Sequence, residues 1–233
     1  MGNAYLNKKE YDKAIEAYQK AVEINPKNDG IYYNMGNAYG NKKEYDKAIE
    51  AYQKAVNINP QRDDAYNNMG IAYADKGEYD KVIEAYQKAV EINPQKDEAY
   101  YNMGMAYYLL KKFDESIKSY IQAININPNY SLDYTNLFEL QLTQNQPFDQ
   151  ALEKKYIELF QNQKESFIQY EMLKILQDIV QNQEVDIEGW VQKYRGVELG
   201  WSFDELREWI DGVEEREIKE RLIEAVGVFE GHG

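Results

Sequence analysis

Asparagine side chains recur in this chain at a spacing that could build a binding surface for a peptide. One row consists of Asn34, Asn68, Asn102 and Asn136, which follow one another at a constant interval. A carboxamide offers one acceptor and two donors, which suits the alternating C=O and N–H groups of an extended backbone without requiring a particular side chain. The row therefore predicts peptide binding, although an asparagine duplicated for its local helix packing would recur in the same way.

A second, partial row and a set of flanking residues extend this predicted surface. Asn3 and Asn37 begin the second row, and Ile71 and Met105 continue it at the same spacing. The flanking residues are Tyr33, Asn67 and Tyr101. Together with the first row they form the candidate binding groove.

Side chains suited to catalysis are scarce. The chain has no cysteine, and its one histidine, His232, stands in a Gly-His-Gly tail. Without a thiol or a well-placed imidazole, the common pairs of nucleophile and base are unavailable. The sequence also lacks a His/Cys cluster and the spacing of a calcium loop. We therefore expect a noncatalytic protein with no metal and no cofactor.

The charge is acidic and unevenly distributed. Asp and Glu number 41 against 27 Lys and Arg, for a net charge of −14. Residues 131–233 hold 22 of the acids and 10 of the bases. Such a surface repels a nucleic-acid backbone and could dock a basic partner. No apolar run approaches the roughly 20 residues that span a bilayer, and no secretory signal is recognisable, so a cytoplasmic protein is expected.

The same constant interval runs through residues 1–130 and predicts stacked helical hairpins. Gly2, Gly36, Gly70 and Gly104 keep it, and so do Pro26, Pro60, Pro94 and Pro128. A fixed period of about 34 residues is typical of a solenoid. In residues 29–62 the apolar positions predict one helix from about Ile31 to Gly40 and a second from about Tyr45 to Ile58. We expect Gly36 to lie where the helices approach closely and Tyr52 to fill the space between repeats.

These positions resemble a known repeat family. Tyr32, Met35-Gly36, Tyr39, Ala48, Tyr52, Ala55 and Pro60 stand where the tetratricopeptide repeat has an aromatic residue, Leu-Gly, Tyr, Ala, an aromatic residue, Ala and Pro. The resemblance covers residues 1–130, as an incomplete copy (1–28) followed by copies at 29–62, 63–96 and 97–130. It implies an all-α, right-handed superhelical solenoid whose first helices line a concave groove, with the asparagine rows on that side.

The resemblance also bears on the ligand. The asparagine row is similar to the ladder in O-linked N-acetylglucosamine transferase, which holds peptide backbone. Repeats that clamp a free carboxylate instead place Lys and Arg beside two asparagines. Here Asn37 and Asn68 stand at the two asparagine places, but Tyr33, Glu98 and Asn102 occupy the basic places. A carboxylate facing Glu98 without a cation would be repelled, so the sequence argues against the carboxylate clamp.

The two ends of the repeat region are irregular. Met1 occupies the Met position of the Met-Gly pair, so we expect a fragment or a start at an internal Met, with an open edge that could stack on another copy. After Pro128 a degenerate fifth hairpin is expected over 131–162, with Phe138 in place of the glycine.

An acidic helical cap or bundle is expected over residues 163–233. Helices are predicted at about Lys164–Gln181, Asp186–Tyr194, Ser202–Ile210 and Val213–Phe229, with a loop at Arg195–Trp201. Ser202 and Glu205 have the spacing of a capping box.

Three functions remain open from the sequence. The first is a noncatalytic scaffold that holds a peptide or protein segment in the groove. The second is a self-assembly module, a homo-oligomer that stacks through the incomplete first repeat. The third is an accessory arm of a larger enzyme whose catalytic part lies outside this chain.

Overall fold

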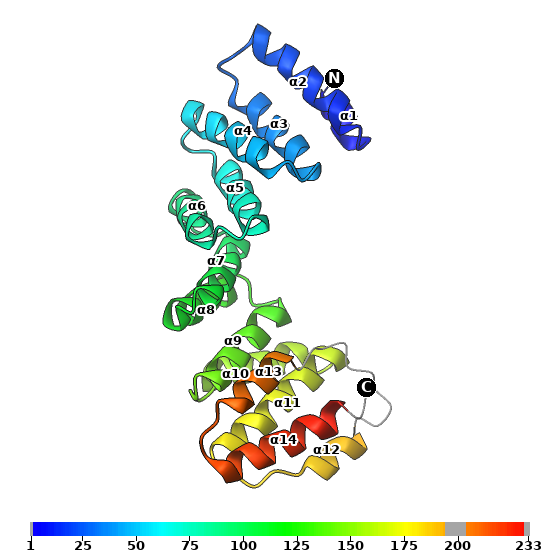
Figure 1. Cartoon of the computed structure of the whole chain (residues 1–233), viewed down its shortest axis with the longest axis vertical. Helices are drawn as coiled ribbons and strands as arrows, with labels where there is room; N and C mark the ends of the chain where they lie inside the picture. The colour runs from blue at the N-terminus through cyan, green and yellow to red at the C-terminus, as the bar shows by residue number, and fades with distance from the viewer. Residues whose placement is uncertain (1, 194–203, 231–233) are drawn as a thin grey trace. The chain divides into compact units, whose positions relative to one another are not determined.

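The computed structural model describes residues 2–193 and 204–230, and these ranges contain helices and turns but no strand (Figure 1). The first eight helices are α1 (Gly2–Asn7), α2 (Tyr11–Ile24), α3 (Asp29–Asn41), α4 (Tyr45–Ile58), α5 (Asp63–Asp75), α6 (Tyr79–Ile92), α7 (Asp97–Leu109) and α8 (Phe113–Ile126). They are followed by α9 (Ser131–Thr143), α10 (Gln150–Phe160), α11 (Lys164–Val180), α12 (Ile187–Lys193), α13 (Asp204–Asp211) and α14 (Arg216–Glu230). The predicted loop Arg195–Trp201, the capping residue Ser202 and His232 lie outside the described residues.

The chain forms two compact units, Met1–Asn127 and Pro128–Gly233. The first contains α1 to α8, and the second contains α9 to α14. The degenerate hairpin expected at 131–162 is thus grouped with the helices that follow it. The predicted all-α architecture is confirmed, and each unit is described by itself below.

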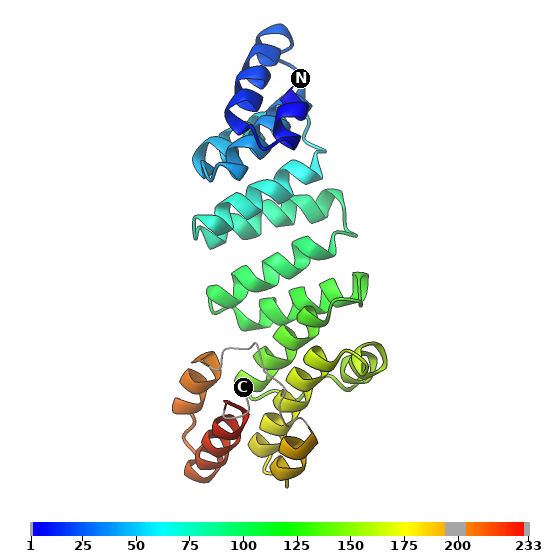
Figure 2. The same cartoon turned by 90° about the vertical axis from the view of Figure 1, so that its right-hand side faces the viewer.

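The first unit is a solenoid of helical hairpins. Each odd-numbered helix packs against the next helix of its own hairpin, and α2, α4 and α6 pack against the first helix of the following hairpin (Figure 2). The helices α3, α5 and α7 begin at Asp29, Asp63 and Asp97, which keeps the predicted period. The second helix of the second hairpin begins and ends at the predicted residues, Tyr45 and Ile58.

Each hairpin closes where a tyrosine ring lies on a glycine. A Cβ atom added to Gly36 would meet the Tyr52 ring at 2.5 Å, and one added to Gly70 would meet the Tyr86 ring at 2.8 Å. Such distances are shorter than carbon contacts allow, so only glycine fits. Tyr52 was predicted to fill the space between repeats. It also borders Ala65 and Met69 of the next repeat, so it closes its own hairpin as well as the junction.

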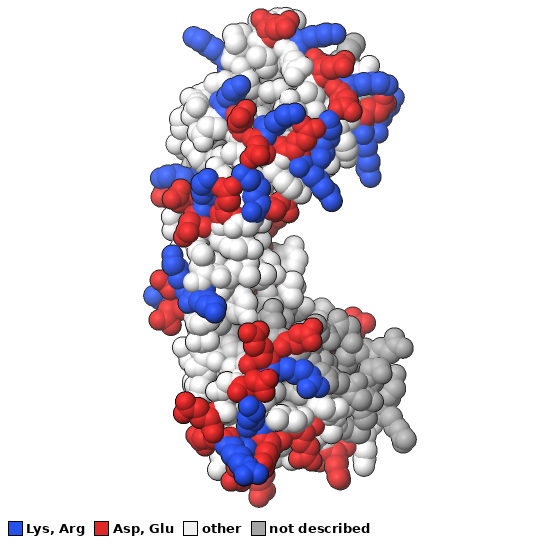
Figure 3. Space-filling view, in the orientation of Figure 1, with Lys and Arg blue, Asp and Glu red and all other residues white. Residues whose placement is uncertain are grey.

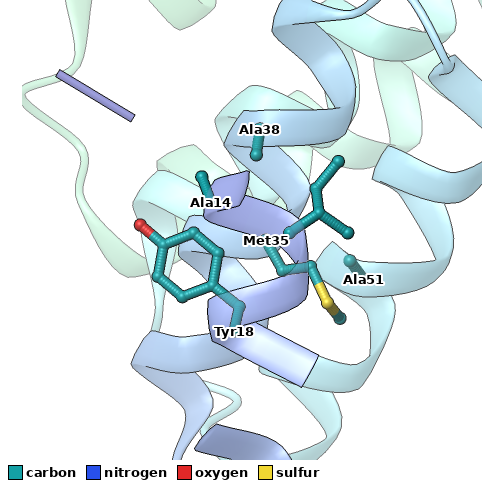
Figure 4. Packing of buried hydrophobic residues seen from close by; sticks show 6 residues of the cluster. Ala14, Tyr18, Met35, Ala38 and Ala51 are labelled. Carbon is teal, nitrogen blue, oxygen red and sulfur yellow. The ribbon is translucent and has the colours of Figure 1, made fainter. Parts of the chain in front are cut away.

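The hydrophobic core is continuous from one hairpin to the next. In the first junction Ala14, Ile15 and Tyr18 of α2 pack against Met35 and Ala38 of α3 and Ala51 of α4 (Figure 4). These side chains are at most 9 % exposed. Because every hairpin shares its apolar surface with the next one, stability depends on the stacking of neighbours.

Polar contacts tie the start of each first helix to the next hairpin. Asn59 Nδ2 donates a hydrogen bond to Asp29 at 3.1 Å, and Arg62 Nε donates to the same carboxylate at 2.7 Å. One repeat later, Asn93 and Lys96 donate to Asp63. The hydrogen bond from Lys96 lowers the pKa of Asp63 and outweighs the effect of burial. Partly exposed pairs of this kind contribute little stability, so we assign them to the register between repeats.

The turn between the two helices of each hairpin places one residue in the left-handed region. These residues are Lys9 (φ 60°), Lys43 (φ 61°), Gly77 (φ 72°) and Lys111 (φ 57°). A side chain in this conformation costs roughly 1 kcal/mol, and glycine avoids that cost.

Lys43→Gly is therefore expected to stabilise the first unit by about 0.5–1 kcal/mol. The gain should appear as a higher midpoint of urea unfolding followed by circular dichroism. Gly77→Lys is the reverse change at the equivalent turn and should lower the midpoint by a similar amount. A lower midpoint for both variants would contradict the strain argument.

The second unit is built around an aromatic cluster and α11. Phe138 of α9 lies 4.7 Å from Phe148 and 5.8 Å from Tyr156, measured between ring centroids. Helix α11 packs more extensively against α9 than α10 does, and it also contacts α14. Asp149 caps α10 by accepting hydrogen bonds from the backbone of Ala151 and Leu152. Acidic side chains outnumber basic ones on the face of this unit that Figure 3 shows.

Candidate functional site

The predicted groove residues of the first unit lie on successive first helices. Helix α3 carries Tyr33, Asn34 and Asn37, helix α5 carries Asn67, Asn68 and Ile71, and helix α7 carries Tyr101, Asn102 and Met105. Asn136 lies on α9 and belongs to the second unit. We use the name amide face for the surface that bears Asn3, Asn34, Asn37, Asn68 and Asn102.

The two asparagine rows meet in pairs across neighbouring repeats. Asn68 Nδ2 donates a hydrogen bond to Asn37 Oδ1 at 2.9 Å, and Asn34 Nδ2 approaches Asn3 Oδ1 at 3.4 Å. In the following repeats Ile71 and Met105 occupy the place of Asn3 and Asn37, so this acceptor is replaced by an apolar side chain. The amide pairs therefore belong to the N-terminal part of the solenoid.

Buried tyrosine hydroxyls already donate hydrogen bonds to some of the amide oxygens. The Tyr52 hydroxyl donates to Asn37 Oδ1 at 2.8 Å, and the Tyr18 hydroxyl donates to Asn3 Oδ1 at 2.7 Å. Burial raises the pKa of the Tyr52 hydroxyl, which keeps it protonated as a donor. The sequence pattern alone did not indicate these bonds. They form because a buried hydroxyl must find an acceptor.

Two groups of the Asn37–Asn68 pair remain available. Asn37 Nδ2 has no partner among the residues that the structure describes, whereas Asn68 Nδ2 donates to both Asn37 and the Tyr33 hydroxyl. Asn68 Oδ1 receives only a long contact of 3.5 Å from Asn67. One donor and one acceptor are thus presented side by side, the complement of a peptide C=O and N–H.

A cavity of about 400 Å³ lies beside this pair. Its lining comes from α1, α3, α4 and α5 and consists of Leu6, Asn37, Gly40, Asn41, Tyr45, Tyr52, Asn68, Ile71, Ala72 and Asp75. A second cavity, of about 420 Å³, lies beside Asn3 and Asn34. Both cavities are large enough to receive single side chains of a ligand.

Apolar side chains are exposed on the first helices of the third and fourth repeats. Ile71 is 40 % exposed, Met105 is 36 % exposed and Leu109 is 49 % exposed. Ile24 and Ile58 are also exposed, but they stand singly at the ends of α2 and α4. Exposed apolar residues on consecutive first helices indicate a surface for contact with another molecule. The polar and apolar parts adjoin where Ile71 lines the same cavity as Asn37 and Asn68.

The predicted flanking residues differ from one another. Tyr33 is half-buried against the Tyr52 ring at 6.1 Å, and Tyr101 lies 5.9 Å from the Tyr120 ring. The Arg62 guanidinium lies over the Tyr33 ring, 4.9 Å from its centroid. Asn67 is only 6 % exposed, so its side chain is packed inside rather than presented to a ligand. This corrects its expected place on the surface, because the small amide sits where the second and fourth repeats have Tyr33 and Tyr101.

Sequence reasoning missed residues at the ends of the first helices and at the start of α4. Asn41 and Asp75 end α3 and α5, Tyr45 begins α4, and all three line the cavity beside the Asn37–Asn68 pair, although none of them was in the predicted groove. The signal was present as a third row at the same spacing, Asn7, Asn41, Asp75 and Leu109.

Among the described residues, no group of three or more His, Cys, Asp or Glu side chains is placed to hold a metal ion. No helix in this part of the chain is long and apolar enough to cross a bilayer.

Family sequence models match the repeat region throughout. A TPR repeat model matches residues 2–43, and a tetratricopeptide repeat model matches residues 31–62, 63–96 and 97–130. The chain is a tetratricopeptide repeat protein. The family that residues 1–130 resemble is thereby confirmed. A sequence search of curated proteins finds no match.

Solved structures of tetratricopeptide repeat proteins share the fold. A crystal structure of MamA matches with a TM-score of 0.62 and 24 % identity over 73 % of this chain and 95 % of MamA. YrrB matches with a TM-score of 0.59 and 22 % identity, covering 71 % of this chain and 86 % of YrrB. A MamA fragment from Desulfovibrio magneticus RS-1 gives a TM-score of 0.58 at 18 % identity, with 69 % and 88 % of the two chains covered. At these identities the similarity concerns the fold alone.

Proposed function

We propose that this protein is a noncatalytic interaction scaffold that binds an extended peptide segment on the amide face of its tetratricopeptide repeats. The observation that carries the proposal is the Asn37–Asn68 pair beside its cavity. Asn37 Nδ2 offers a donor to a peptide carbonyl, and Asn68 Oδ1 offers an acceptor to a peptide N–H. Because the C=O and N–H groups of the ligand belong to its backbone, these hydrogen bonds require an extended segment more than a particular sequence.

The exposed apolar residues supply the side-chain part of this recognition. A segment running from the amide pairs toward the fourth repeat would cover Ile71, Met105 and Leu109. Burial of this surface favours binding by roughly 25 cal/mol per Å² of apolar area, before the ordering of the peptide is subtracted. YrrB, which has the same fold, is described as a TPR protein with an unusual peptide-binding site. The fold is therefore compatible with the proposal.

The proposal is tested with a blocked decapeptide library that carries randomised positions, from which the wild-type protein selects its ligands. Asn68→Ala with Asn102→Ala should weaken the affinity for the best selected peptide by about 1–3 kcal/mol, because polar groups of the bound peptide lose their partners. Isothermal titration calorimetry measures the change.

A matched double variant on the second helices controls for the loss of two amides. Gln53 and Gln122 are exposed on α4 and α8, so Gln53→Ala with Gln122→Ala should leave peptide affinity unchanged. Equal affinity for the wild type and the Asn68/Asn102 variant would refute the role of the amide face. Failure of the wild type to select any peptide would refute peptide binding itself.

A further inference from the structure

The cavity beside the Asn37–Asn68 pair is lined, among the described residues, by one carboxylate and no cation. Among the described residues that line it, Asp75 is the one charged side chain. Asn37, Asn41 and Asn68 supply amides, and an apolar strip is made by Leu6, Ile71 and Ala72. The cavity therefore combines an acidic end with an apolar wall.

The Asp75 carboxylate is exposed and forms no ion pair with a described residue. The lysines closest in the repeat register are engaged elsewhere, since Lys42 Nζ lies 2.6 Å from Asp12 and Lys76 Nζ lies 2.7 Å from Asp46. Tyr45 lines the same cavity as Asp75. Desolvation raises the pKa of Tyr45, and the charge of Asp75 raises it further. The Tyr45 ring adds a wall to the cavity without neutralising the Asp75 carboxylate.

The carboxylate is particular to one repeat. The equivalent residue of the preceding repeat is Asn41, whose Oδ1 accepts a hydrogen bond from the Tyr11 hydroxyl at 3.5 Å. The equivalent residue of the following repeat is Leu109. In the preceding repeat the equivalent contact between Tyr11 and Asn41 therefore forms with a neutral amide in place of the acid. Stacking of the hairpins does not require the negative charge.

We propose that this cavity receives a lysine or arginine side chain of the bound peptide, with its cationic head on Asp75 and its methylene stem along Ile71 and Ala72. The inference rests on the proposed peptide-binding function and adds a specificity to it. Lysine and arginine carry an apolar stem below a charged head, which matches an apolar wall that ends in a carboxylate. An acidic ligand side chain would meet the uncompensated charge of Asp75 and be rejected.

The test uses the blocked decapeptide library with each position fixed in turn as Lys, Arg, Gln, norleucine or Glu. The wild-type protein should enrich Lys and Arg at one position roughly tenfold over Gln and norleucine, and it should disfavour Glu there. Asp75→Asn copies the arrangement at Asn41, so it should fold and still bind peptides while losing the preference for Lys and Arg. Glu84→Gln removes the same charge from the exposed face of α6 in the same repeat and should keep the preference.

The outcomes separate this inference from the function on which it rests. Peptide selection without a basic position, or a basic preference that survives Asp75→Asn, would overturn the inference and leave peptide binding intact. Loss of the preference in Glu84→Gln as well would also overturn it, because net charge would then explain the selectivity. If the wild type selects no peptide at all, the proposed function fails and this inference fails with it.

Discussion

Replacing Gly36 by Ala is expected to destabilise the first unit by about 2–3 kcal/mol, the scale of overpacking in a close-packed interior. The added Cβ would lie 2.5 Å from the Tyr52 ring, which is 4 % exposed and packed against the next repeat. The ring cannot retreat without disturbing both its own hairpin and the junction. Urea unfolding followed by circular dichroism should show the loss, and hydrogen exchange should locate it in α3, α4 and α5.

Gly40→Ala is the matched control, because Gly40 lies one helical turn later on α3. A Cβ atom there would approach nothing closer than the Tyr52 hydroxyl at 3.7 Å. Alanine is a better helix former than glycine by about 1 kcal/mol, so this variant should be slightly more stable than the wild type. Opposite signs for the same substitution would show that the close approach, and not helix propensity, selects glycine at position 36. Equal effects would contradict this explanation.

The Gly36 variant also connects packing to the candidate site. The Tyr52 hydroxyl that bonds Asn37 belongs to the ring that lies on Gly36. A displaced ring would move this hydroxyl away from the Asn37–Asn68 pair. Peptide affinity should therefore fall in Gly36→Ala under conditions where the protein is still folded.

The repeat architecture was predictable because its signals are local and periodic. The prolines, glycines and apolar positions recur at one constant interval, so the contacts they make within a hairpin and with the next hairpin recur as well. The helix Tyr45–Ile58 was therefore placed to the residue. The family resemblance followed from the same positions. Because the pattern repeats, the helices predicted for one copy predict those of the other copies as well.

The details of the candidate site depend on contacts between repeats, which the period alone does not describe. The Asn37–Asn68 hydrogen bond joins residues 31 positions apart, and the Tyr52 hydroxyl competes for the same acceptor. Sequence reasoning identified the amides but not how they share donors and acceptors. Asp75 was missed for a related reason. It is the single acid in the row Asn7, Asn41, Asp75 and Leu109, and the sequence does not show that it lines a cavity.

The fifth hairpin shows why a weakening repeat is harder to interpret. In each repeat of the first unit a tyrosine 16 positions after the glycine covers it, as Tyr52 covers Gly36. In the fifth hairpin Phe138 replaces the glycine, and the residue 16 positions later is Lys154, which is exposed. The sequence indicated that the pattern had changed. It did not indicate that Phe138 would become the centre of a different core.

Phe138→Ala is expected to destabilise the second unit by about 3–5 kcal/mol, the usual cost of removing a buried aromatic ring. Phe138 is fully buried, and its ring contacts Phe148, Tyr156 and Tyr170 at centroid distances of 4.7, 5.8 and 6.0 Å. The neighbouring rings of Phe148, Tyr156 and Tyr170 are themselves buried, so loss of the Phe138 ring leaves a cavity among them. The three tryptophans all lie in the second unit, so tryptophan fluorescence reports its unfolding separately from the first unit.

Leu159→Ala is the control on the same hairpin, because Leu159 is 40 % exposed and its removal leaves no enclosed cavity. The free energy of unfolding obtained from tryptophan fluorescence should change by less than about 1 kcal/mol. A small effect of Phe138→Ala would contradict this expectation. It would mean that the fifth hairpin tolerates a small residue at the position where the repeats of the first unit need glycine. A large effect would show that one position of the repeat has opposite requirements in the two units. In the first unit the small residue makes room for a neighbouring ring, whereas in the second unit the residue is itself the ring that the core needs.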